Sequence, residues 1–589
     1  MNDDSGWINV AIVGGGLSGM AAAYELAKGV AGKRKVRIHI YERNLRTGGN
    51  IDSQVVELGV KAGAVSEPVR RWVDMGVNDI NLSSYHNIAR VMAETGYYGK
   101  CSEDSSAEAA SENLKALEDS VCFFSEQEQL CYTMDGGLRA GVSDQNRDLD
   151  RAKNGKYKCL MAIVDKAALK QVYRRCDPKP ATPEYDLTTT VSQFFDRVLA
   201  KNAKVLQEVS NDSLCNPDSG QCDYSAYWAA DDIEDTMACL RLLRDCVYYP
   251  RISAMYFAND AGPEQMLLAA PYRYYRFQEG VGGDSVPPDR RYFTQGASHW
   301  FYHLASYISG DLPKKINQEA VDGQPVLEIE FLRRAVALKV VESGFLVGHE
   351  GEDERDCEPS DEKDSAGKNG ASKAAVSEIL YDYCIMATHA DAAQRALVFE
   401  QGAVLTESLA GKSESQVRKW LASISYTTSV AVAHTYTRLL PPDVNAWRTY
   451  NVAIRQGAGL KPYSMTYVCN RHQNDVSGDQ WNSAGAPQVF VTLNPMTRIP
   501  DQYVLKKRDL LMVGNDGQAL GDSQVVEYFK HNLLDSACFH TQQEIKKYHE
   551  SLPRLFFTGG WSLGAGLHEE CWLQGQSIAR SICAKLKLS

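Results

Sequence analysis

The sequence lacks any apolar run near the length of a membrane-spanning helix, and it lacks C-x-x-C pairs and Cys/His clusters at zinc spacing. Basic residues are also fewer than acidic ones: the sequence has 63 Lys and Arg but 75 Asp and Glu, which gives a net charge of −12. A surface that binds nucleic acid or an anionic membrane needs an excess of positive charge. We therefore expect no transmembrane segment, no metal site and no nucleic-acid partner.

Signals for export and organelle targeting are missing as well. An apolar strand begins within ten residues of the N-terminus, which leaves no room for a cleaved signal, and the last residues, Leu-Lys-Leu-Ser, match no peroxisomal or retention address. The 15 cysteines are odd in number and scattered. Cys215 and Cys222 flank a turn-like loop, but a disulfide between them is disfavoured without an export signal. We expect a cytoplasmic protein with reduced thiols.

The chain has ample length and apolar content, because 589 residues at 44% hydrophobic are enough for several structural units. Hydrophobic periodicity predicts a helix over 17–28 and mainly helical structure over 160–250. The segments expected to form strands are 8–13, 36–42, 325–348 (a hairpin or meander), 379–387, 426–437, 488–493 and 554–560, before a last helix from about Glu570. Residues 101–120 and 350–374 are polar, and we expect loosely ordered insertions there.

The sequence GGGLSG at residues 14–19 follows the first expected strand directly and opens the first expected helix. Gly14 would allow the tight turn, Gly16 would let the backbone approach a pyrophosphate, and Gly19 would let the helix pack on the strand. The helix N-terminus at Leu17 and Ser18 offers unpaired N–H groups to phosphate. Glu42 ends the second strand, where an acid binds a ribose diol. This strand–helix–strand unit predicts a Rossmann-like dinucleotide site.

Residues 42–50, ERNLRTGGN, resemble the E-x-x-x-R-x-G-G-R stretch of flavoproteins in the amine-oxidoreductase superfamily. The acid, the arginine and both glycines match, whereas Asn50 stands where Arg or His is usual. The resemblance implies a noncovalent FAD, with this stretch wrapping its pyrophosphate and approaching the flavin. The FAD-binding residues that it implies here are Glu42, Arg43, Arg46, Gly48, Gly49 and Asn50.

Two distant segments resemble other FAD-binding parts of this superfamily. Residues 381–390, YDYCIMATHA, resemble the strand and turn beside the FAD adenosine, and residues 555–579 resemble the closing FAD motif. In that motif a helix points its N-terminus, here at Leu567 and His568, toward the flavin pyrimidine, after a strand that ends at Gly559. Gly560 departs from the acid that many relatives carry. A covalent link through Cys571 is disfavoured, because the S-G-G-C-Y pattern is missing.

A narrower resemblance covers most of the chain. Residues 72–92, 388–397, 423–451, 490–495 and 566–571 resemble predicted NAD/FAD-binding proteins that occur beside or fused to cyclopropane-fatty-acid synthases, and polyunsaturated fatty-acid isomerases are similar. The resemblance implies an α/β protein, with a Rossmann-like doubly wound FAD domain and a mixed α+β substrate domain of amine-oxidase-like type. The expected bounds are 1–100, 291–400 (with an acidic disordered insertion, 350–375) and 551–589 for the FAD domain, and 101–290 and 401–550 for the substrate domain.

The reaction that we expect is flavin hydride transfer, which would desaturate or isomerise the double bonds of a small, apolar, lipid-like substrate such as a polyunsaturated fatty acid or polyene. The aromatic segment 247–278 would line its tunnel, with an arginine pairing a carboxylate. Oxidation of an amine and noncatalytic binding of FAD are the alternatives. The substrate-binding candidates are Tyr256, Arg273, Arg276, Trp447 and Tyr450. The catalytic candidates are His568, Glu569 and His434, although His434 also fits a satisfied core histidine.

Overall fold

The structure is a computed structural model of the chain. It describes residues 6–31, 33–44, 46–58, 69–99, 112–117, 120–125, 130–133, 137–140, 147–173, 185–210, 224–256, 263–281, 287–320, 326–333, 335–350, 376–400, 408–454, 463–473, 488–506 and 524–587. The expected acidic insertion at 350–375 lies almost entirely outside these residues, as do Cys215 and Cys222.

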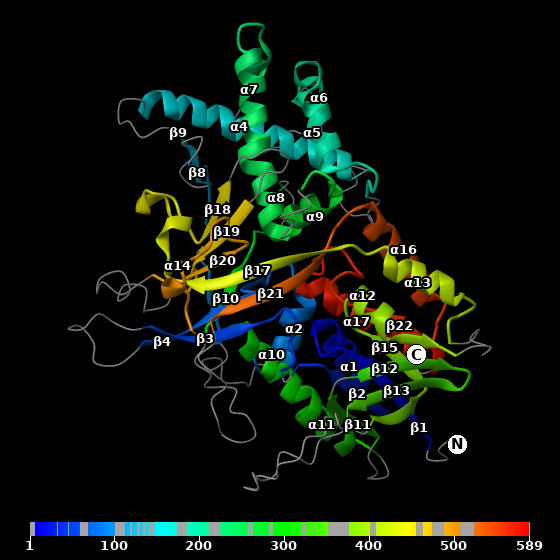
Figure 1. Cartoon of the computed structure of the whole chain (residues 1–589). Helices are drawn as coiled ribbons and strands as arrows, with labels where there is room; N and C mark the ends of the chain where they lie inside the picture. Colours follow the sequence, from blue (N-terminus) through cyan, green and yellow to red (C-terminus); the bar gives the residue numbers. More distant parts are fainter. Residues whose placement is uncertain are drawn as a thin grey trace, which may run out of the picture.

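A five-stranded parallel sheet forms the base of the protein, in the order β11-β2-β1-β15-β22 (Figure 1). Its strands are β1 (Trp7–Val13), β2 (Lys35–Glu42), β11 (Leu327–Arg333), β15 (Tyr383–Met386) and β22 (Leu555–Phe557). All four pairings are parallel, so the carboxyl ends of strands from three distant parts of the chain share one edge. The Rossmann-like α/β fold expected from the sequence is therefore confirmed.

Two expectations about strands in this region are corrected. The hairpin or meander expected over 325–348 is only partly right, because β11 pairs in parallel with β2 at the edge of the base sheet. The single strand expected over 379–387 is two strands, β14 (Val376–Tyr381) and β15. The chain changes sheet at Asp382, whose carboxylate accepts the Asn9 N–H at 2.8 Å. A buried apolar run does not reveal such a break when one polar residue makes it.

Helices and a second sheet cover the two faces of the base sheet. On one face α1 (Leu17–Val30) packs along α17 (His568–Lys585), and both bury small residues there. The other face lies against a four-stranded sheet in the order β14-β13-β12-β16. Its remaining strands are β12 (Ala335–Val341), β13 (Gly344–Glu350) and β16 (Leu397–Phe399).

An eight-stranded sheet lies beyond the base and draws on two distant parts of the chain. Its order is β21-β17-β20-β19-β18-β7-β8-β9, and β18 pairs in parallel with β7. The strands are β7 (Val121–Ser125), β8 (Leu130–Thr133), β9 (Gly137–Ala140), β17 (Tyr426–His434), β18 (Tyr450–Ile454), β19 (Tyr463–Val468), β20 (Phe490–Leu493) and β21 (Val526–Asn532). The strands expected near 426–437 and 488–493 are confirmed as β17 and β20.

Two small sheets complete the strand structure. One is β5-β10-β6, formed by β5 (Asp79–Asn81), β10 (Arg290–Phe293) and β6 (Leu114–Ala116), and the other is the pair β3 (Ser53–Leu58) and β4 (Val69–Asp74). Strand β6 corrects the expectation of a loosely ordered segment over all of 101–120, because Leu114 is buried in the core and three backbone positions pair with β10.

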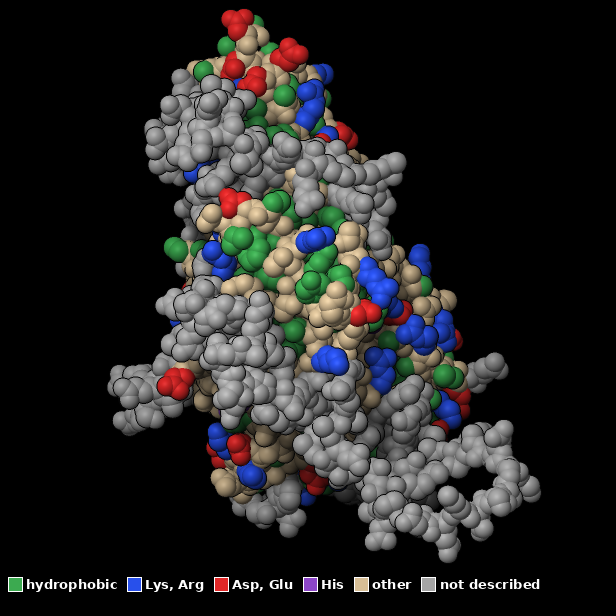
Figure 2. All heavy atoms as spheres, turned by 60° about the vertical axis from the view of Figure 1, so that its left-hand side comes forward, with side chains coloured by type: hydrophobic (Ala, Val, Ile, Leu, Met, Phe, Trp, Pro, Cys, Tyr) green, Lys and Arg blue, Asp and Glu red, His purple; other side chains and the backbone are tan. Residues whose placement is uncertain are grey.

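Helices fill the upper part of the molecule in Figure 1, which confirms the mainly helical structure expected over 160–250. They are α4 (Arg147–Val172), α5 (Val191–Leu199), α6 (Lys204–Ser210), α7 (Ile233–Leu243), α8 (Tyr249–Tyr256) and α9 (Ala269–Gln278). Figure 2 shows acidic side chains gathered at the upper tip, where α7 begins with Glu234 and Asp235 in its first turn. Lys156 on α4 bridges to α7 through Asp235 at 2.7 Å.

The other helices connect the sheets. They are α2 (His86–Glu94), α10 (Ala297–Ser306), α11 (Leu312–Gln318), α12 (Ala390–Ala396), α13 (Glu414–Ala422), α14 (Cys469–His472) and α16 (Ser536–Glu550). Within the described ranges, no helix combines the length and the apolar character that crossing a membrane requires. The expectation of reduced thiols holds for several buried cysteines such as Cys384, but Cys159 on α4 is disulfide-bonded.

The α1–α17 contact tolerates no side chain at Gly575. A Cβ atom at this position would lie 2.6 Å from both Ala21 Cβ and the Ala22 nitrogen. We expect Gly575→Ala to lower the free energy of unfolding by about 1–3 kcal/mol, because overpacking outweighs the gain in helix propensity. Gly155→Ala is the control, since Gly155 is exposed on α4 and has no atom within 4 Å of its Cβ position. It should raise that free energy by about 0.5–1 kcal/mol in urea titrations. Equal effects of the two changes would contradict close packing.

Candidate functional site

The glycine loop lies at the carboxyl edge of the base sheet and leaves no space for side chains where the backbone segments cross. Gly14 has a φ of +117°, and a Cβ there would lie 2.2 Å from the Ala387 carbonyl oxygen. A Cβ on Gly19 would lie 2.1 Å from the Gly14 carbonyl oxygen. Gly16 differs, because no described atom lies within 4 Å of its Cβ position. The N-terminus of α1 has no side-chain cap. Its N–H groups and the open space at Gly16 are what a pyrophosphate requires.

The segment 46–50 is folded against this loop. Gly48 has a φ of +132° and donates its N–H to the Gly15 carbonyl oxygen at 3.1 Å. Gly49, with a φ of +61°, would place a Cβ 3.6 Å from the Gly16 Cα. Both conformations favour glycine, so the paired glycines have a backbone reason to occur here. The two glycine stretches therefore form one surface.

Arg46 and Asn50 serve this surface in different ways. The Arg46 guanidinium donates to the Ile51 carbonyl oxygen at 2.8 Å and pairs with Asp52 at 3.0 Å. It therefore holds the segment after the paired glycines. The carbonyl oxygen of Asn50 lies against Gly76, where a Cβ would approach it to 2.2 Å. Arg46 has donors beyond these two contacts, since a guanidinium carries five.

Glu42 ends β2 and reaches the glycine loop. One carboxylate oxygen accepts the Gly15 N–H at 3.0 Å, and the other accepts the Asn44 N–H at 2.9 Å. These bonds fix the carboxylate beside the phosphate-binding backbone. Each oxygen keeps further acceptor capacity for a hydroxyl donor. Arg43, the next residue, is exposed at the same edge.

The turns after β15 and β22 meet at this edge too. Gly559 has a φ of +142°, and a Cβ there would lie 2.8 Å from the Thr388 carbonyl oxygen. The Trp561 indole N–H donates to that same carbonyl oxygen at 2.9 Å. A Cβ on Gly566 would lie 2.3 Å from the Gly560 carbonyl oxygen, so this turn closes tightly on itself. The structure thus brings the segments expected around 388 and 559 together.

Glu569 is engaged at the start of a neighbouring helix. Its carboxylate accepts the Asn87 backbone N–H at 3.0 Å, the Asn87 side-chain amide at 2.6 Å and the Ile88 N–H at 3.2 Å. These are donors from the first turn of α2, so Glu569 caps that helix from outside. This structural use of both oxygens leads us to leave Glu569 out of the proposed chemistry.

Glu570 holds the turn that precedes α17. It accepts the Ala565 N–H at 2.8 Å and the Leu567 N–H at 3.1 Å, and it lies 3.4 Å from the Arg273 guanidinium. Burial raises the pKa of Glu570, while Arg273 and the backbone donors lower it. The Arg273 contact connects α9 with the N-terminus of α17.

His568 begins α17 and is only 7% exposed. Neither ring nitrogen has a hydrogen-bond partner among the described residues. Burial lowers the pKa of His568 to about 4, so the imidazole is neutral at pH 7. A neutral imidazole offers one donor and one acceptor, and buried polar atoms without partners are rare in proteins. Together with the helix N-terminus, this side chain indicates a place for a polar ligand.

Two other predicted residues are satisfied inside the protein. His434 lies in β17, where one ring nitrogen is 2.6 Å from the Thr492 hydroxyl and the other accepts the Tyr436 N–H at 3.0 Å. The Trp447 indole donates to the Pro441 carbonyl oxygen at 2.8 Å. These contacts are those of core residues, so neither side chain enters the proposed chemistry.

The predicted residues of α8 and α9 lie beside α17. Tyr256 donates its hydroxyl to a carbonyl oxygen of α9 at 3.0 Å. Arg273 and Arg276 stack over the rings of Tyr185 and Tyr173, at 4.8 and 4.6 Å from the centroids. Stacking of this kind contributes to packing, so the arginines of this segment have structural contacts.

The structure also shows an interior cluster that sequence reasoning found only in part. Asp79 on β5 accepts hydrogen bonds from the Arg290 guanidinium on β10 and, at 2.8 Å, from the Tyr450 hydroxyl on β18. The His472 ring lies 6.1 Å from the Tyr450 ring and 6.0 Å from the Tyr292 ring. Tyr450 was predicted as a substrate contact, but the spacing of the others forms no motif. Across the described ranges, no three His, Cys, Asp or Glu residues are grouped to hold a metal.

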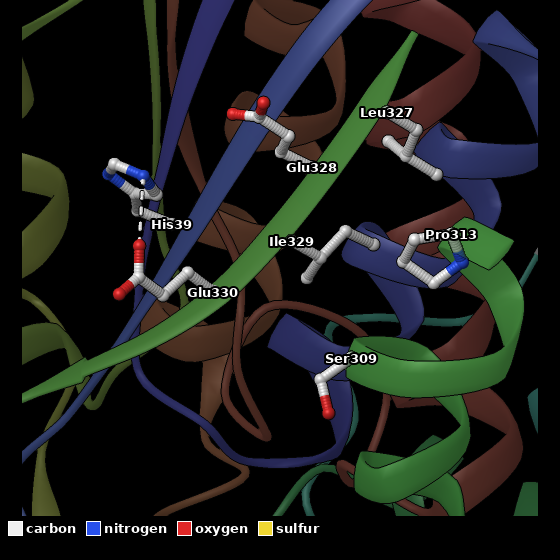
Figure 3. A pocket seen from close by; sticks show the side chains of 7 residues that line it. All are labelled: His39, Ser309, Pro313, Leu327, Glu328, Ile329 and Glu330. Carbon is white, nitrogen blue, oxygen red and sulfur yellow. Dashed lines mark ion pairs between the residues drawn. The ribbon is translucent and has the colours of Figure 1, made fainter. Parts of the chain in front are cut away.

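One surface pocket of about 410 Å³ lies elsewhere, at the outer strand of the base sheet (Figure 3). It is lined by His39, Ser309, Pro313, Leu327, Glu328, Ile329 and Glu330. His39 lies 3.8 Å from Glu330, and Glu328 pairs with Arg37 at 2.6 Å. None of the lining residues belongs to the glycine loop, the 46–50 segment or the α17 turn. The pocket is therefore separate from the candidate site.

One of three comparisons with known proteins, the one with family models, agrees with the glycine loop. The NAD(P)-binding Rossmann-like domain family matches residues 12–95. No curated protein matches the sequence. Among solved structures, the chain is similar to cyclohexylamine oxidase from Brevibacterium oxydans IH-35A, at 12% identity and a TM-score of 0.44, over 98% of this chain and 99% of that one. Wild-type putrescine oxidase bound to putrescine and the CLA-producing fatty acid isomerase from P. acnes each give 13% identity and a TM-score of 0.46, with the same coverage.

Asp74 is a buried acid at the junction of β4 and α10. It is 3% exposed and accepts hydrogen bonds from the Ser53 hydroxyl and, at 3.0 Å, from the Ala297 N–H. Burial raises the pKa of Asp74 from 3.8 to about 8, against the lowering effect of these donors. The native carboxyl group is therefore protonated at neutral pH.

Asp74→Asn tests this protonation. Between pH 4 and 8 the native state holds a proton that the unfolded chain has lost, so the free energy of unfolding of the parent protein falls as pH rises. The amide has no such proton. The free-energy difference between variant and parent should therefore shift in favour of the variant by up to about 1.4 kcal/mol per pH unit. Urea titrations at pH 5 and 7.5 measure it. Asp311→Asn on the exposed surface is the control, and a pH-independent difference for Asp74→Asn would refute the assignment.

Proposed function

We propose that this protein is an FAD-dependent oxidoreductase. The observation that carries the proposal is the meeting of two helix N-termini, each with space or polar atoms for a ligand, at one edge of the parallel sheet. Among the described residues, the backbone of Gly16 at α1 faces open space, and both ring nitrogens of His568 at α17 lack a partner. A flavin dinucleotide is long enough to contact the N-termini of both α1 and α17. Bound there, FAD would accept a hydride from a substrate C–H bond.

The residues present fit such a cofactor. The glycines are required by backbone crossings and leave the phosphate-facing surface bare. Glu42 would accept hydrogen bonds from a ribose, and the α1 N–H groups would bind the pyrophosphate. The N-terminus of α17 would stabilise negative charge, and His568 would offer it a donor and an acceptor. The residues proposed to contact FAD are Gly14, Gly16, Leu17, Ser18, Gly19, Glu42, Arg43, Arg46, Gly48, Gly49, Asn50, Gly559, Gly560, Leu567 and His568.

A lipid-like substrate, desaturated or isomerised at its double bonds, is the first candidate. The aromatic side chains of α8 and α9 beside the α17 turn support it. The arginines expected to bind its carboxylate have other contacts, however: Arg251 pairs with Glu279 and stacks 3.9 Å from the Tyr275 centroid, and Arg273 pairs with Glu570. The geometry therefore supports the apolar body of such a substrate better than its acidic head group.

Oxidation of an amine is the second candidate, and the interior cluster favours it. The neutral imidazole of His472 and the carboxylate of Asp79 are hydrogen-bond acceptors in a buried setting. A substrate that carries an N–H on the carbon to be oxidised would meet acceptors there. A hydrocarbon chain would leave the Nε2 atom of His472, which has no partner among the described residues, unsatisfied, which costs about 1–3 kcal/mol.

The bound cofactor is tested by purification and by Glu42→Ala. We expect a yellow protein with flavin absorbance, and we expect the variant to bind FAD at least about tenfold more weakly, because ribose hydrogen bonds to a carboxylate are lost. Titration of the flavin-depleted protein with FAD measures the dissociation constant. Glu328→Ala, which removes a carboxylate from the outer strand of the same sheet, is the control. A colourless protein that cannot take up FAD would refute the proposal.

Anaerobic mixing distinguishes the substrate classes. If the protein oxidises amines, a polyamine or an aromatic amine should bleach the flavin absorbance, whereas a polyunsaturated fatty acid should leave it unchanged. If it acts on lipids, the fatty acid should bleach the flavin or be converted to an isomer, which product chromatography detects even without net reduction. A protein that holds FAD but does neither would be a noncatalytic FAD-binding protein.

A further inference from the structure

Two buried histidines lie within the electrostatic range of Asp79 in the interior of the protein. His472 is 3% exposed and His568 is 7% exposed. The Nε2 atom of His472 and both ring nitrogens of His568 find no hydrogen-bond partner within the part of the chain that the structure describes. Asp79 acts electrostatically on both rings. Three imidazole nitrogens without a partner among the described residues, in two rings that Asp79 influences, indicate that a ligand completes the cluster.

The residues come from four separate elements. Asp79 lies on β5 and Arg290 on β10, which pair in the small sheet, whereas Tyr450 lies on β18 of the large sheet and His472 ends α14. The Asp79 and Arg290 side chains are 16% and 11% exposed. Burying an ion pair costs solvation, and such pairs are weak contributors to stability. The presence of the Asp79–Arg290 ion pair at the junction of two sheets is therefore better explained by a function than by stability.

The first turn of α17 connects this cluster with the proposed flavin site. The Tyr85 ring lies 6.2 Å from the His568 ring. The charges of Asp79, Arg290 and Glu570 all affect the pKa of the Tyr85 hydroxyl. The charge of Asp79 in turn raises the pKa of His568, against the larger lowering effect of burial. The cluster therefore adjoins the end of α17 that would face the flavin.

We propose that Asp79, Tyr450 and His472 bind the polar group of the substrate, and that His472 Nε2 accepts a hydrogen bond from an N–H or O–H on the carbon to be oxidised. The inference rests on the proposed flavin function and deepens it. It assigns a substrate with a hydrogen-bond donor, an amine or an alcohol, rather than a bare hydrocarbon. The carbon would lose its hydride to the flavin as its double bond to nitrogen or oxygen forms. The proton lost from the N–H or O–H passes to Nε2, and the Asp79 carboxylate balances the charge of the imidazolium that forms.

The electrostatics of the cluster agree with an acceptor role. Burial, helped by Arg290 and Arg71 and opposed by Asp79, lowers the pKa of His472 to about 4, so the ring is neutral at pH 7. Burial alone would raise the pKa of Asp79, but Arg290 and the Tyr450 hydroxyl hold it below its usual value. A neutral imidazole next to an ionised carboxylate attracts a donor, whereas a substrate carboxylate there would face Asp79.

Binding of small probes to the flavin-loaded protein tests this inference. Benzylamine, benzyl alcohol, benzoate and toluene share a ring and differ in the polar group. Anaerobic titrations followed by the flavin spectrum should show the amine or the alcohol binding at least tenfold more tightly than toluene and benzoate. Whichever of benzylamine and benzyl alcohol binds more tightly identifies the donor of the substrate as N–H or O–H.

His472→Phe keeps a ring of similar size and removes the acceptor. It should weaken donor binding about tenfold and leave toluene binding unchanged, because only the hydrogen bond is lost. His472→Leu, which also removes the acceptor, is the second variant if His472→Phe does not fold. His549→Phe is the matched control, since His549 is equally buried but its Nε2 already accepts the Phe557 N–H.

Two outcomes separate the inference from the function on which it rests. If the protein binds FAD but donors bind no better than toluene, or if His472→Phe changes all four probes alike, the inference is wrong and the flavin function stands. If the protein binds no FAD, the proposed function itself fails.

Discussion

Close approach of backbones at the carboxyl edge of the parallel sheet is the constraint on which the site depends. Three chain crossings there exclude a Cβ atom: Gly14 against Ala387, Gly559 against Thr388, and Gly566 against Gly560. Because the first two contacts join segments that are far apart in sequence, a glycine lost at either of them would displace the segment carrying another part of the site. The loops are thus fixed by sterics, which is what a ligand that spans several segments requires.

Charge is arranged differently on the two sides of this edge. At the glycine loop the helix dipole and exposed Arg43 favour an anion, with Glu42 fixed by backbone donors. At the α17 end the groups are buried, and burial keeps His568 and His472 neutral while Arg290 keeps Asp79 ionised. Neutral imidazoles beside a carboxylate cost less to bury than free charges, yet they still supply hydrogen bonds. The glycine loop therefore suits phosphate, and the N-terminus of α17 suits a polar group that can lose a proton.

The sequence predicts the glycine loop, β1, β2 and the α17 turn well, because their chemistry is local: glycine spacing and one acid at a strand end define them. It does not predict Asp79, Arg290 and His472, because their meeting depends on β5 pairing with β10 and on α14 ending beside β18. It also suggests roles for Glu569 and His434 from their neighbours in sequence. Their hydrogen bonds to α2 and within the large sheet are tertiary contacts, which periodicity cannot show.

The interior cluster lies where the eight-stranded sheet meets the small sheet β5-β10-β6. Tyr450 reaches from the large sheet to Asp79, so one hydrogen bond connects the eight-stranded sheet to the small sheet β5-β10-β6. Apolar residues in place of Asp79, Arg290 and Tyr450 would pack the same junction without a buried charge to satisfy, and replacing buried ion pairs by apolar groups is often stabilising. A polar junction at this place, near imidazole nitrogens that have no partner in the part of the chain that the structure describes, therefore argues for a role in binding rather than in stability.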